Sequence, residues 1–170
     1  YDDIARRLHE CDAKLQTLLG ERGSACVDLG RAPKAGSKSR VEFDVRQSLA
    51  NWAGVDLTRI NGLGLAAVMK ILSEIGPDVS RFETVKHFCS WLGLSPGTKI
   101  SGGKVLSAKT KRSANRVRQA LKMAAMSLSD IDSALGAYYR RLCSRMDKPR
   151  ANTATVHKLA APFTGIPGYR

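Results

Sequence analysis

The sequence predicts a mainly α-helical protein with a small β excursion near residues 98–107 and a separate coiled-coil helix at its N-terminus. Apolar residues recur at helical spacing along most of the chain, and glycine and proline divide this pattern into short segments. Near residues 98–107 the helical spacing is lost, and a pair of glycines separates two short extended pieces. With 43% hydrophobic residues among 170, the chain can bury a core, which excludes global disorder.

The first predicted helix covers residues 2–20 and has the periodicity of a coiled coil. A helix this short is unstable alone, so it needs a partner helix from the same chain or from another subunit. We assign residues 1–22 to this coiled-coil segment, residues 23–40 to a flexible linker rich in glycine and serine, and residues 41–170 to a C-terminal domain. The apolar positions of the first helix are spaced alternately by four and three residues: Ile4, Leu8, Cys11, Leu15 and Leu18.

Apolar spacing resumes at residue 41 and continues through a glycine hairpin. One helical face ends at Gly54, and a short helix then leads through Gly62 and Gly64 into a second helix that ends near residue 75. The two glycines allow positive φ and close approach of another molecule, and the free amides that open the second helix suit a phosphate. This order resembles the helix-hairpin-helix motif, which holds the DNA backbone without reading its sequence. An ordinary helical turn with glycine caps is the alternative.

Four further helices are predicted over residues 83–92, 113–129, 131–146 and 151–161. Gly20 is expected to end the first helix, Pro149 to separate the last two, and Pro162 and Pro167 to end regular structure.

The charge is strongly one-sided. Lys and Arg number 28 against 15 Asp and Glu, which gives a net charge of +13. Residues 1–83 hold 12 basic and 12 acidic residues, whereas residues 84–170 hold 16 basic and three acidic ones. We therefore expect a nucleic-acid partner. A solvated basic face and an anionic membrane surface are the weaker alternatives.

Several kinds of site are not expected on this chain. The four cysteines and three histidines are scattered without the paired spacing of a zinc site, so we predict no metal site and reduced thiols. No nucleotide-binding P-loop occurs, and no apolar run approaches the roughly 20 residues of a membrane span. Because the chain starts at Tyr1 without an apolar leader, we expect a non-secreted fragment of a longer protein.

Ser101 is the candidate nucleophile, in the sequence Ser101-Gly102-Gly103-Lys104. A serine that attacks a DNA phosphate must be exposed and needs cations that stabilise the charge developing on the phosphoryl oxygens. An ordinary turn, in which the serine bonds its own backbone, is the alternative. The candidate DNA-binding residues are the glycines of both turns and the nearby cations: Gly62, Gly64, Lys99, Gly102, Gly103, Lys104, Lys109, Lys111, Arg112 and Arg116.

Motifs over residues 41–160 resemble, in the same order, the C-terminal half of one transposase family. The family is that of the DEDD-type bacterial insertion-sequence transposases of the "one-ten" class, which are relatives of the pilin-gene inverting recombinases. Residues 2–20 are similar to the coiled coil that links the two family domains, whereas residues 161–167 depart from the longer basic helix that usually ends the family. The motifs are Ile60-Asn61-Gly62-Leu63-Gly64, Ser73-Glu74-Ile75-Gly76, Arg81-Phe82, Trp91-Leu92-Gly93-Leu94-Ser95-Pro96, Ile100-Ser101-Gly102-Gly103-Lys104, Ala114-Asn115-Arg116 and residues 134–142.

The resemblance implies a transposase domain that cleaves and joins DNA strands through a covalent intermediate on Ser101. The family's N-terminal RuvC-like domain carries four acidic metal ligands. We expect this chain to lack it, so a divalent metal (Mg) is expected on that domain and none here, and the chain alone is expected to be inactive. The implied partners are DNA (element ends and target), a structured guide RNA and further copies through the coiled coil, in the bacterial cytoplasm at the nucleoid. The alternative is a non-catalytic DNA- or RNA-binding helical module.

Overall fold

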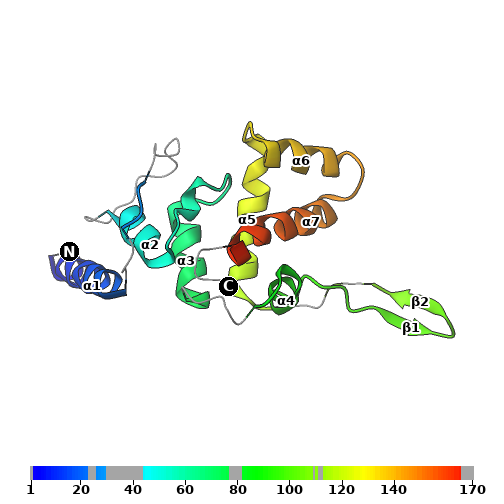
Figure 1. Cartoon of the computed structure of the whole chain (residues 1–170), viewed down its shortest axis with the longest axis horizontal. Coiled ribbons are helices and arrows are strands. Elements are labelled where there is room, and N and C mark those ends of the chain that lie inside the picture. Colours follow the sequence, from blue (N-terminus) through cyan, green and yellow to red (C-terminus); the bar gives the residue numbers. More distant parts are fainter. Residues whose placement is uncertain are drawn as a thin grey trace.

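The computed structural model describes residues 2–22, 26–29, 44–76, 82–108, 110 and 113–165, and over these residues the protein is mainly helical with one two-stranded sheet. The predicted fold class is therefore confirmed. Figure 1 shows an elongated molecule, with α1 at one end, the strands at the other and the remaining helices between them. The elements are α1 Asp2–Arg22, α2 Val45–Ala53, η1 Leu57–Arg59, α3 Leu65–Ile75, α4 Val85–Trp91, β1 Lys99–Ser101, β2 Lys104–Ser107, α5 Arg116–Ser127, η2 Leu128–Asp130, α6 Ala134–Cys143, α7 Lys148–Ala160 and η3 Ala161–Gly165.

Helix α5 forms the centre of the core, and α3 and α7 pack against it (Figure 1). Burial of each large apolar side chain contributes about 1.5–3 kcal/mol to the stability of the fold. The packing of α3 and α7 on α5 therefore holds α5 in place, and with it the segments that precede and follow α5. The side chains that fill it are buried and recur at helical spacing: Val68, Ile71 and Leu72 of α3, Val117, Leu121 and Ala124 of α5, and Val156 and Leu159 of α7.

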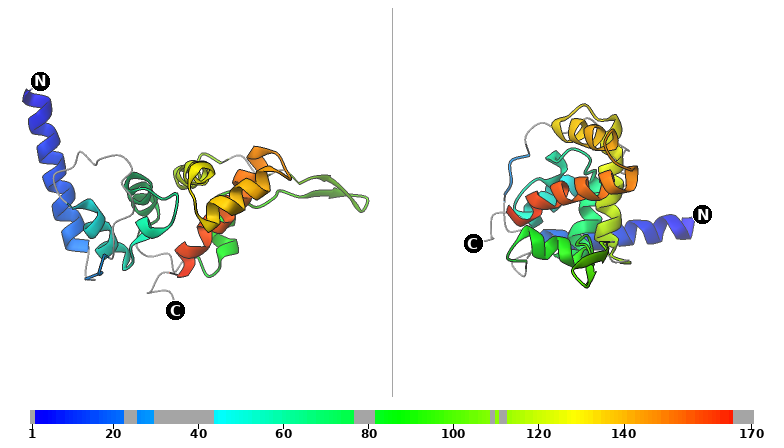
Figure 2. Two further views of the ribbon diagram at one scale, coloured as in Figure 1. Left: turned by 90° about the horizontal axis from the view of Figure 1, so that it is seen from above. Right: turned by 90° about the vertical axis from the view of Figure 1, so that its right-hand side faces the viewer.

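Helix α1 packs against α2 at its C-terminal end, whereas its N-terminal turns project away from the body (Figure 2). Leu19 is buried in the core, but Ile4 and Leu8 of the apolar stripe are exposed to 64% and 61%. The predicted helix is present, although it continues through Gly20 to Arg22. Coiled-coil pairing of the stripe stays a prediction, as do the domain boundaries.

The predicted linker over residues 23–40 lies outside the described residues, apart from residues 26–29. Val27 is held against α2, because its amide donates to the Asn51 side chain and its carbonyl accepts from Gln47.

A buried ion pair connects α2 to η1 and so positions the glycine turn that follows. The Asp56 carboxylate accepts hydrogen bonds from Arg46 at 2.5 Å and from both the amide and the hydroxyl of Thr58. Burial alone would raise the pKa of Asp56, but the hydrogen bonds from Thr58 and Arg46 outweigh it and hold the pKa below its usual value of 3.8. The carboxylate is therefore charged at neutral pH and caps η1.

The starts of two helices differ from the prediction because capping residues set them. Helix α5 begins at Arg116 rather than at residue 113, since the Asn115 side chain accepts from the amide of Arg118. Helix α6 begins at Ala134 rather than at residue 131, since Ser133 caps the amide of Gly136. Such caps satisfy amides that a helix leaves unbonded at its start.

The predictions for two prolines are wrong. Helix α7 begins at Lys148 rather than at residue 151, because Pro149 lies in its first turn, where proline needs no N–H partner. Pro162 does not end regular structure but lies in η3. Phe163 beside it is buried, with its ring centroid 6.1 Å from that of Phe88 on α4. Pro167 lies outside the described residues.

Candidate nucleic-acid interface

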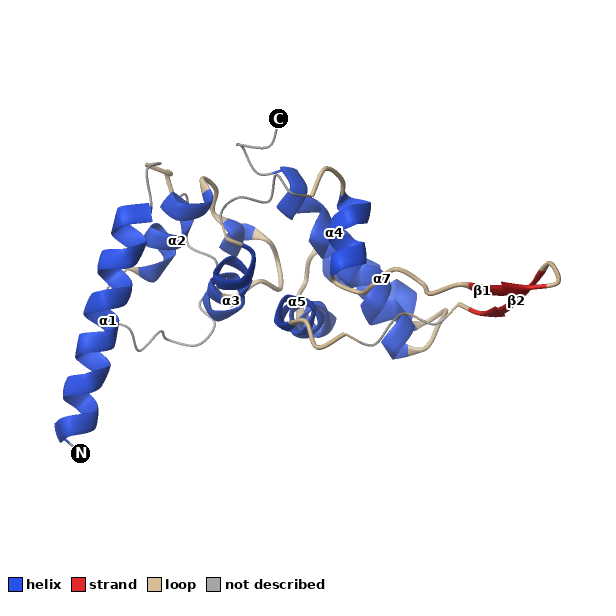
Figure 3. Ribbon diagram, turned by 90° about the horizontal axis from the view of Figure 1, so that it is seen from below, coloured by secondary structure: helices blue, strands red, loops and turns tan. Residues whose placement is uncertain are grey.

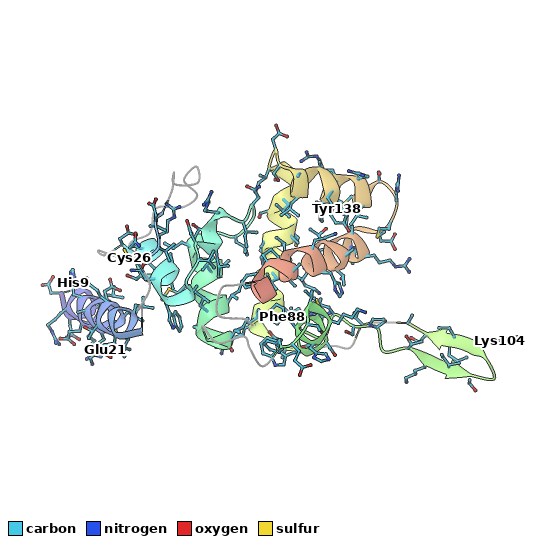
Figure 4. All side chains as sticks on the ribbon, in the orientation of Figure 1. His9, Glu21, Cys26, Phe88, Lys104 and Tyr138 are labelled. Carbon is cyan, nitrogen blue, oxygen red and sulfur yellow. The ribbon has the colours of Figure 1, made fainter. Side chains whose placement is uncertain are left out.

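Strands β1 and β2 form an antiparallel arm that projects from the helical body. Figure 3 shows that the arm makes up the end of the molecule opposite α1, and Figure 4 labels Lys104 near its tip. Gly102 and Gly103 form the turn, with φ values of 55° and 75°. Positive φ at both central residues is the geometry of a two-residue hairpin that matches the twist of its strands, and glycine adopts it without strain. We call residues 99–107 the arm.

The strand register sorts the side chains of the arm onto two faces. Ser101 pairs with Lys104, and Ile100 pairs with Val105. Because successive side chains of a strand alternate, Ser101 shares one face with Lys99, Lys104 and the exposed Leu106, whereas Ile100 and Val105 lie on the other. The register shifts between Lys99 and Ile100, so Lys99 lies opposite Ser107. The Cβ atoms of directly opposite residues lie about 5 Å apart, so the Lys104 ammonium can reach a group bound at Ser101.

The face of the arm that holds Ser101 is open to a large ligand. Ser101, Lys99 and Lys104 are all exposed. A Cβ atom added to Gly102 or Gly103 would meet no heavy atom within 4 Å, so the turn itself does not obstruct approach. The arrangement places a hydroxyl and two cations where a phosphate can contact them together.

The structure gives less support to the other cations of the predicted site. Arg116, at the start of α5, is exposed, and it donates to Glu74 of α3 at 3.2 Å. The ion pair with Glu74 neutralises part of the charge of Arg116. The structure does not describe Lys109, Lys111 or Arg112, so their part in the site stays a prediction.

The two glycines before α3 have different surroundings. Gly62 has a φ of +90°, and a Cβ there would lie 2.7 Å from the carbonyl oxygen of Ala124. The close approach expected at Gly62 is therefore made by α5. Gly64 is exposed with nothing within 4 Å of the Cβ position, and it begins α3 without a side-chain cap.

The amides that begin α3 are available for an anion. Ala67 and Val68 both donate to the Gly64 carbonyl. No acceptor for the amides of Leu65 and Ala66 occurs in the part of the chain that the structure describes. Phosphate binding by these amides, and with it the helix-hairpin-helix assignment, stays a prediction.

The structure does not bring the glycine turn and the arm together. Gly62 packs near the C-terminal end of α5, at Ala124 and Leu128, whereas the arm connects to its N-terminal end through residues 108–115. The 12 residues of α5 span about 18 Å at 1.5 Å per residue. The two predicted phosphate sites are therefore separate in the structure.

The described ranges contain neither a metal cluster nor a membrane span. Within them, no group of three or more His, Cys, Asp or Glu side chains could hold a metal ion. None of the described helices is long and apolar enough to span a membrane. Sequence reasoning did not single out the cations on α6 and α7, although the charge count of residues 84–170 includes them.

Comparison with known proteins places this chain among the transposases. The chain belongs to the Transposase IS116/IS110/IS902 family, whose family model matches residues 56–140, half of the chain. It is also 32% identical over 90 residues to the Insertion element IS110 uncharacterized 43.6 kDa protein of Streptomyces coelicolor. That match covers 52% of this chain and 22% of the relative, so the chain spans about a fifth of the relative's length. No solved structure matches the chain.

Proposed function

We propose that this chain is the DNA-binding and strand-joining part of an IS110-type transposase, in which Ser101 attacks the DNA phosphate. The observation that carries the proposal is the open face of the arm on which Ser101 lies with Lys99 and Lys104. The matched family segment, residues 56–140, contains the whole arm. Membership of a transposase family supports DNA as the substrate.

The chemistry is a phosphoryl transfer to a serine oxygen. Ser101 Oγ attacks the phosphorus and forms a P–O bond while the bond to the leaving sugar oxygen breaks. The serine proton passes to a base, and the leaving oxygen takes up a proton. Lys99 and Lys104 stabilise the negative charge that develops on the phosphoryl oxygens. Attack on the serine phosphodiester by the sugar hydroxyl of a second strand reverses the bond changes and joins the strands.

We place metal-dependent chemistry outside this chain. The polar groups on the Ser101 face of the arm are hydroxyls and ammonium groups, and no carboxylate lies between Glu83 and Asp130. This donor set does not suit Mg²⁺, which prefers oxygen ligands such as carboxylates. The metal ligands are proposed for an N-terminal RuvC-like domain, as the family resemblance implies.

Two further parts of the proposal concern partners. The free amides of Leu65 and Ala66 are proposed to hold a DNA phosphate away from the arm, as the start of a helix favours an anion. The exposed stripe of α1 is proposed to pair with a second copy of the chain, since Ile4 and Leu8 are not covered by any described residue. A structured guide RNA is the third proposed partner, and the cation excess of residues 84–170 is compatible with it.

The test joins this chain to the RuvC-like domain of an IS110-type transposase and supplies DNA with insertion-sequence ends. We expect Ser101→Ala to abolish the denaturant-stable protein–DNA adduct while leaving duplex binding within about threefold of the original. The matched control is Ser107→Ala, because Ser107 lies opposite Lys99 on the same arm. Full adduct formation by Ser101→Ala would refute the nucleophile.

The second candidate function is a non-catalytic module that only holds nucleic acid. The 16 basic and three acidic residues of positions 84–170 favour polyanion binding with or without catalysis. A pure binding module gives no adduct even with the RuvC-like domain present and Ser101 intact. Preference for folded RNA over DNA duplexes would assign the module to the guide RNA.

A further inference from the structure

A second group of cations lies where α6 meets α7, outside the arm and almost entirely beyond the family match at residues 56–140. Asp147 is the sole carboxylate of residues 133–165, and α6, α7 and their connection hold six basic residues, which leaves a net charge of +5. Arg140 is held by the backbone carbonyls of Ser129 and Ile131. Lys158 lies in the last turn of α7, 6.0 Å from the centroid of the Tyr138 ring. The other four are exposed at or near the connection, and we call them the α6–α7 cluster: Arg141, Arg145, Lys148 and Arg150.

The protein itself compensates little of this charge. Arg150 lies 3.9 Å from Asp147, and both are largely exposed, so water screens the pair. Arg141, Arg145 and Lys148 form no ion pair with any carboxylate in the described part of the chain. Lys148 and Arg150 lie in the first turn of α7, where the positive end of the helix dipole disfavours cations. The positions of these two cations cost stability unless an anion binds, whereas Arg141 lies in the last turn of α6, where the helix dipole favours a cation.

The chemistry of the cluster favours a phosphate backbone over a membrane. A membrane-surface helix needs an exposed apolar face below its cations. Among the exposed large apolar residues only Met146 belongs to the α6–α7 segment, and the inner faces of both helices are buried in the core. Four exposed cations with little exposed apolar surface match a chain of phosphates.

The position of the cluster relates it to the arm. Figures 1 and 2 both show the connection between α6 and α7 on the side from which the arm projects, and α1 lies at the opposite end. A duplex that brings one phosphate to Ser101 can therefore continue beside this connection. Because duplex DNA carries one charge per about 1.7 Å of its axis, it offers phosphates to both places at once.

We propose that the α6–α7 cluster is a second phosphate-binding surface, which holds the backbone of the same DNA duplex beyond the phosphate at Ser101. This inference rests on the proposed function, because it takes the substrate of the arm to be duplex DNA. The cluster contributes affinity and positioning, and it makes no sequence-specific contact.

The experiment measures the affinity of the full 170-residue chain for a short DNA duplex over a series of salt concentrations. The test variant carries Arg141→Gln, Arg145→Gln and Lys148→Gln. The matched control carries Arg6→Gln, Arg7→Gln and Lys14→Gln, which remove the same charge from exposed positions on α1. We expect the test variant to lose about 10- to 100-fold in affinity and the slope of log K against log salt to fall by about 2–3, with less than about threefold loss for the control.

Two further variants test whether a loss of affinity comes from misfolding or from the arm rather than from the cluster. Arg141→Lys with Arg145→Lys and Lys148→Arg keeps the charge, and we expect affinity within about threefold of the original. Lys99→Gln with Lys104→Gln weakens the arm alone. If this arm variant loses affinity and the cluster variant does not, the cluster proposal fails and the proposed function stands. If the original chain does not bind duplex DNA, both fail.

Two other results also overturn the cluster proposal. Equal losses for the cluster variant and the α1 control would show a response to net charge alone. A loss confined to duplex RNA of the same length would assign the cluster to RNA.

Discussion

At the scale of single residues, Asp56 has the largest structural effect that we can attribute to one side chain. Its carboxylate is buried and bonds to Arg46 and Thr58 just before the glycine turn. Replacing it with asparagine leaves the Arg46 guanidinium without its counter-charge. We expect Asp56→Asn to lower the free energy of unfolding by about 2–4 kcal/mol in urea denaturation. Asp132→Asn, at an exposed position, is the control and is expected to change it by less than about 0.5 kcal/mol.

The same carboxylate predicts a pH dependence. The pKa of Asp56 is below 3.8 in the folded protein, so its contribution is fully present above the unfolded value and is lost as pH falls through the folded pKa. The difference in unfolding free energy between the original chain and Asp56→Asn should therefore shrink as pH falls below 3.8. A difference that stays constant down to the acid transition would contradict the assigned role of the charge.

Gly62 gives a second residue-scale prediction. A Cβ there would lie 2.7 Å from a backbone oxygen of α5, and the φ of +90° strains any residue with a side chain. We expect Gly62→Ala to lower the free energy of unfolding by about 2 kcal/mol or more in urea denaturation. Gly64→Ala, in open space at a negative φ, should cost less than about 1 kcal/mol. Equal costs would show that packing against α5 is not what requires Gly62.

At this scale the sequence predicted which residues matter but not their surroundings. The pattern singled out Gly62 and Gly64 as positions that allow positive φ and a close approach, and only Gly62 has a positive φ. Only the fold shows that α5 occupies the space beside Gly62, because that contact joins residues about 60 positions apart along the chain. The conformation around Ser101 was more predictable, since a two-residue glycine turn places its neighbours by local geometry alone.

At the scale of elements, α1 combines two separate roles along one helix. Leu19 is buried against the core, whereas Leu8 is exposed to 61%. We expect Leu19→Ala to lower the free energy of unfolding of the monomer by about 2 kcal/mol, and Leu8→Ala to change it by less than about 0.5 kcal/mol. In sedimentation experiments, Leu8→Ala should instead reduce self-association. Unchanged self-association would contradict pairing through the stripe.

Element boundaries were less predictable than element type. Asn115 and Ser133 set helix starts through side-chain hydrogen bonds that apolar periodicity does not reveal. Pro149 supports a helix start as well as it breaks a helix interior, so its position alone did not decide between them. Phe163 lies in a segment expected to be irregular, and its burial against Phe88 depends on tertiary packing.

At the scale of the whole molecule, the positive charge is concentrated in the second half of the sequence. Residues 1–83 are balanced in charge, and residues 84–170, which include the arm and the α6–α7 cluster, hold the whole excess of +13. The sequence predicted this excess and a polyanionic partner from composition. It did not predict that α5 separates the glycine turn from the arm, because the arrangement follows from how α3 and α7 pack on α5.

Direct identification of the modified residue tests the central claim most directly. The adduct between the joined protein and DNA is trapped, digested with nuclease and trypsin, and analysed by mass spectrometry. Trypsin cleaves after Lys99 and Lys104, so the account predicts a nucleotide attached to Ser101 in the short peptide Ile100–Lys104, or in a peptide extended by one missed cleavage. A nucleotide on a tyrosine or on another serine, with peptide 100–104 unmodified, would contradict it.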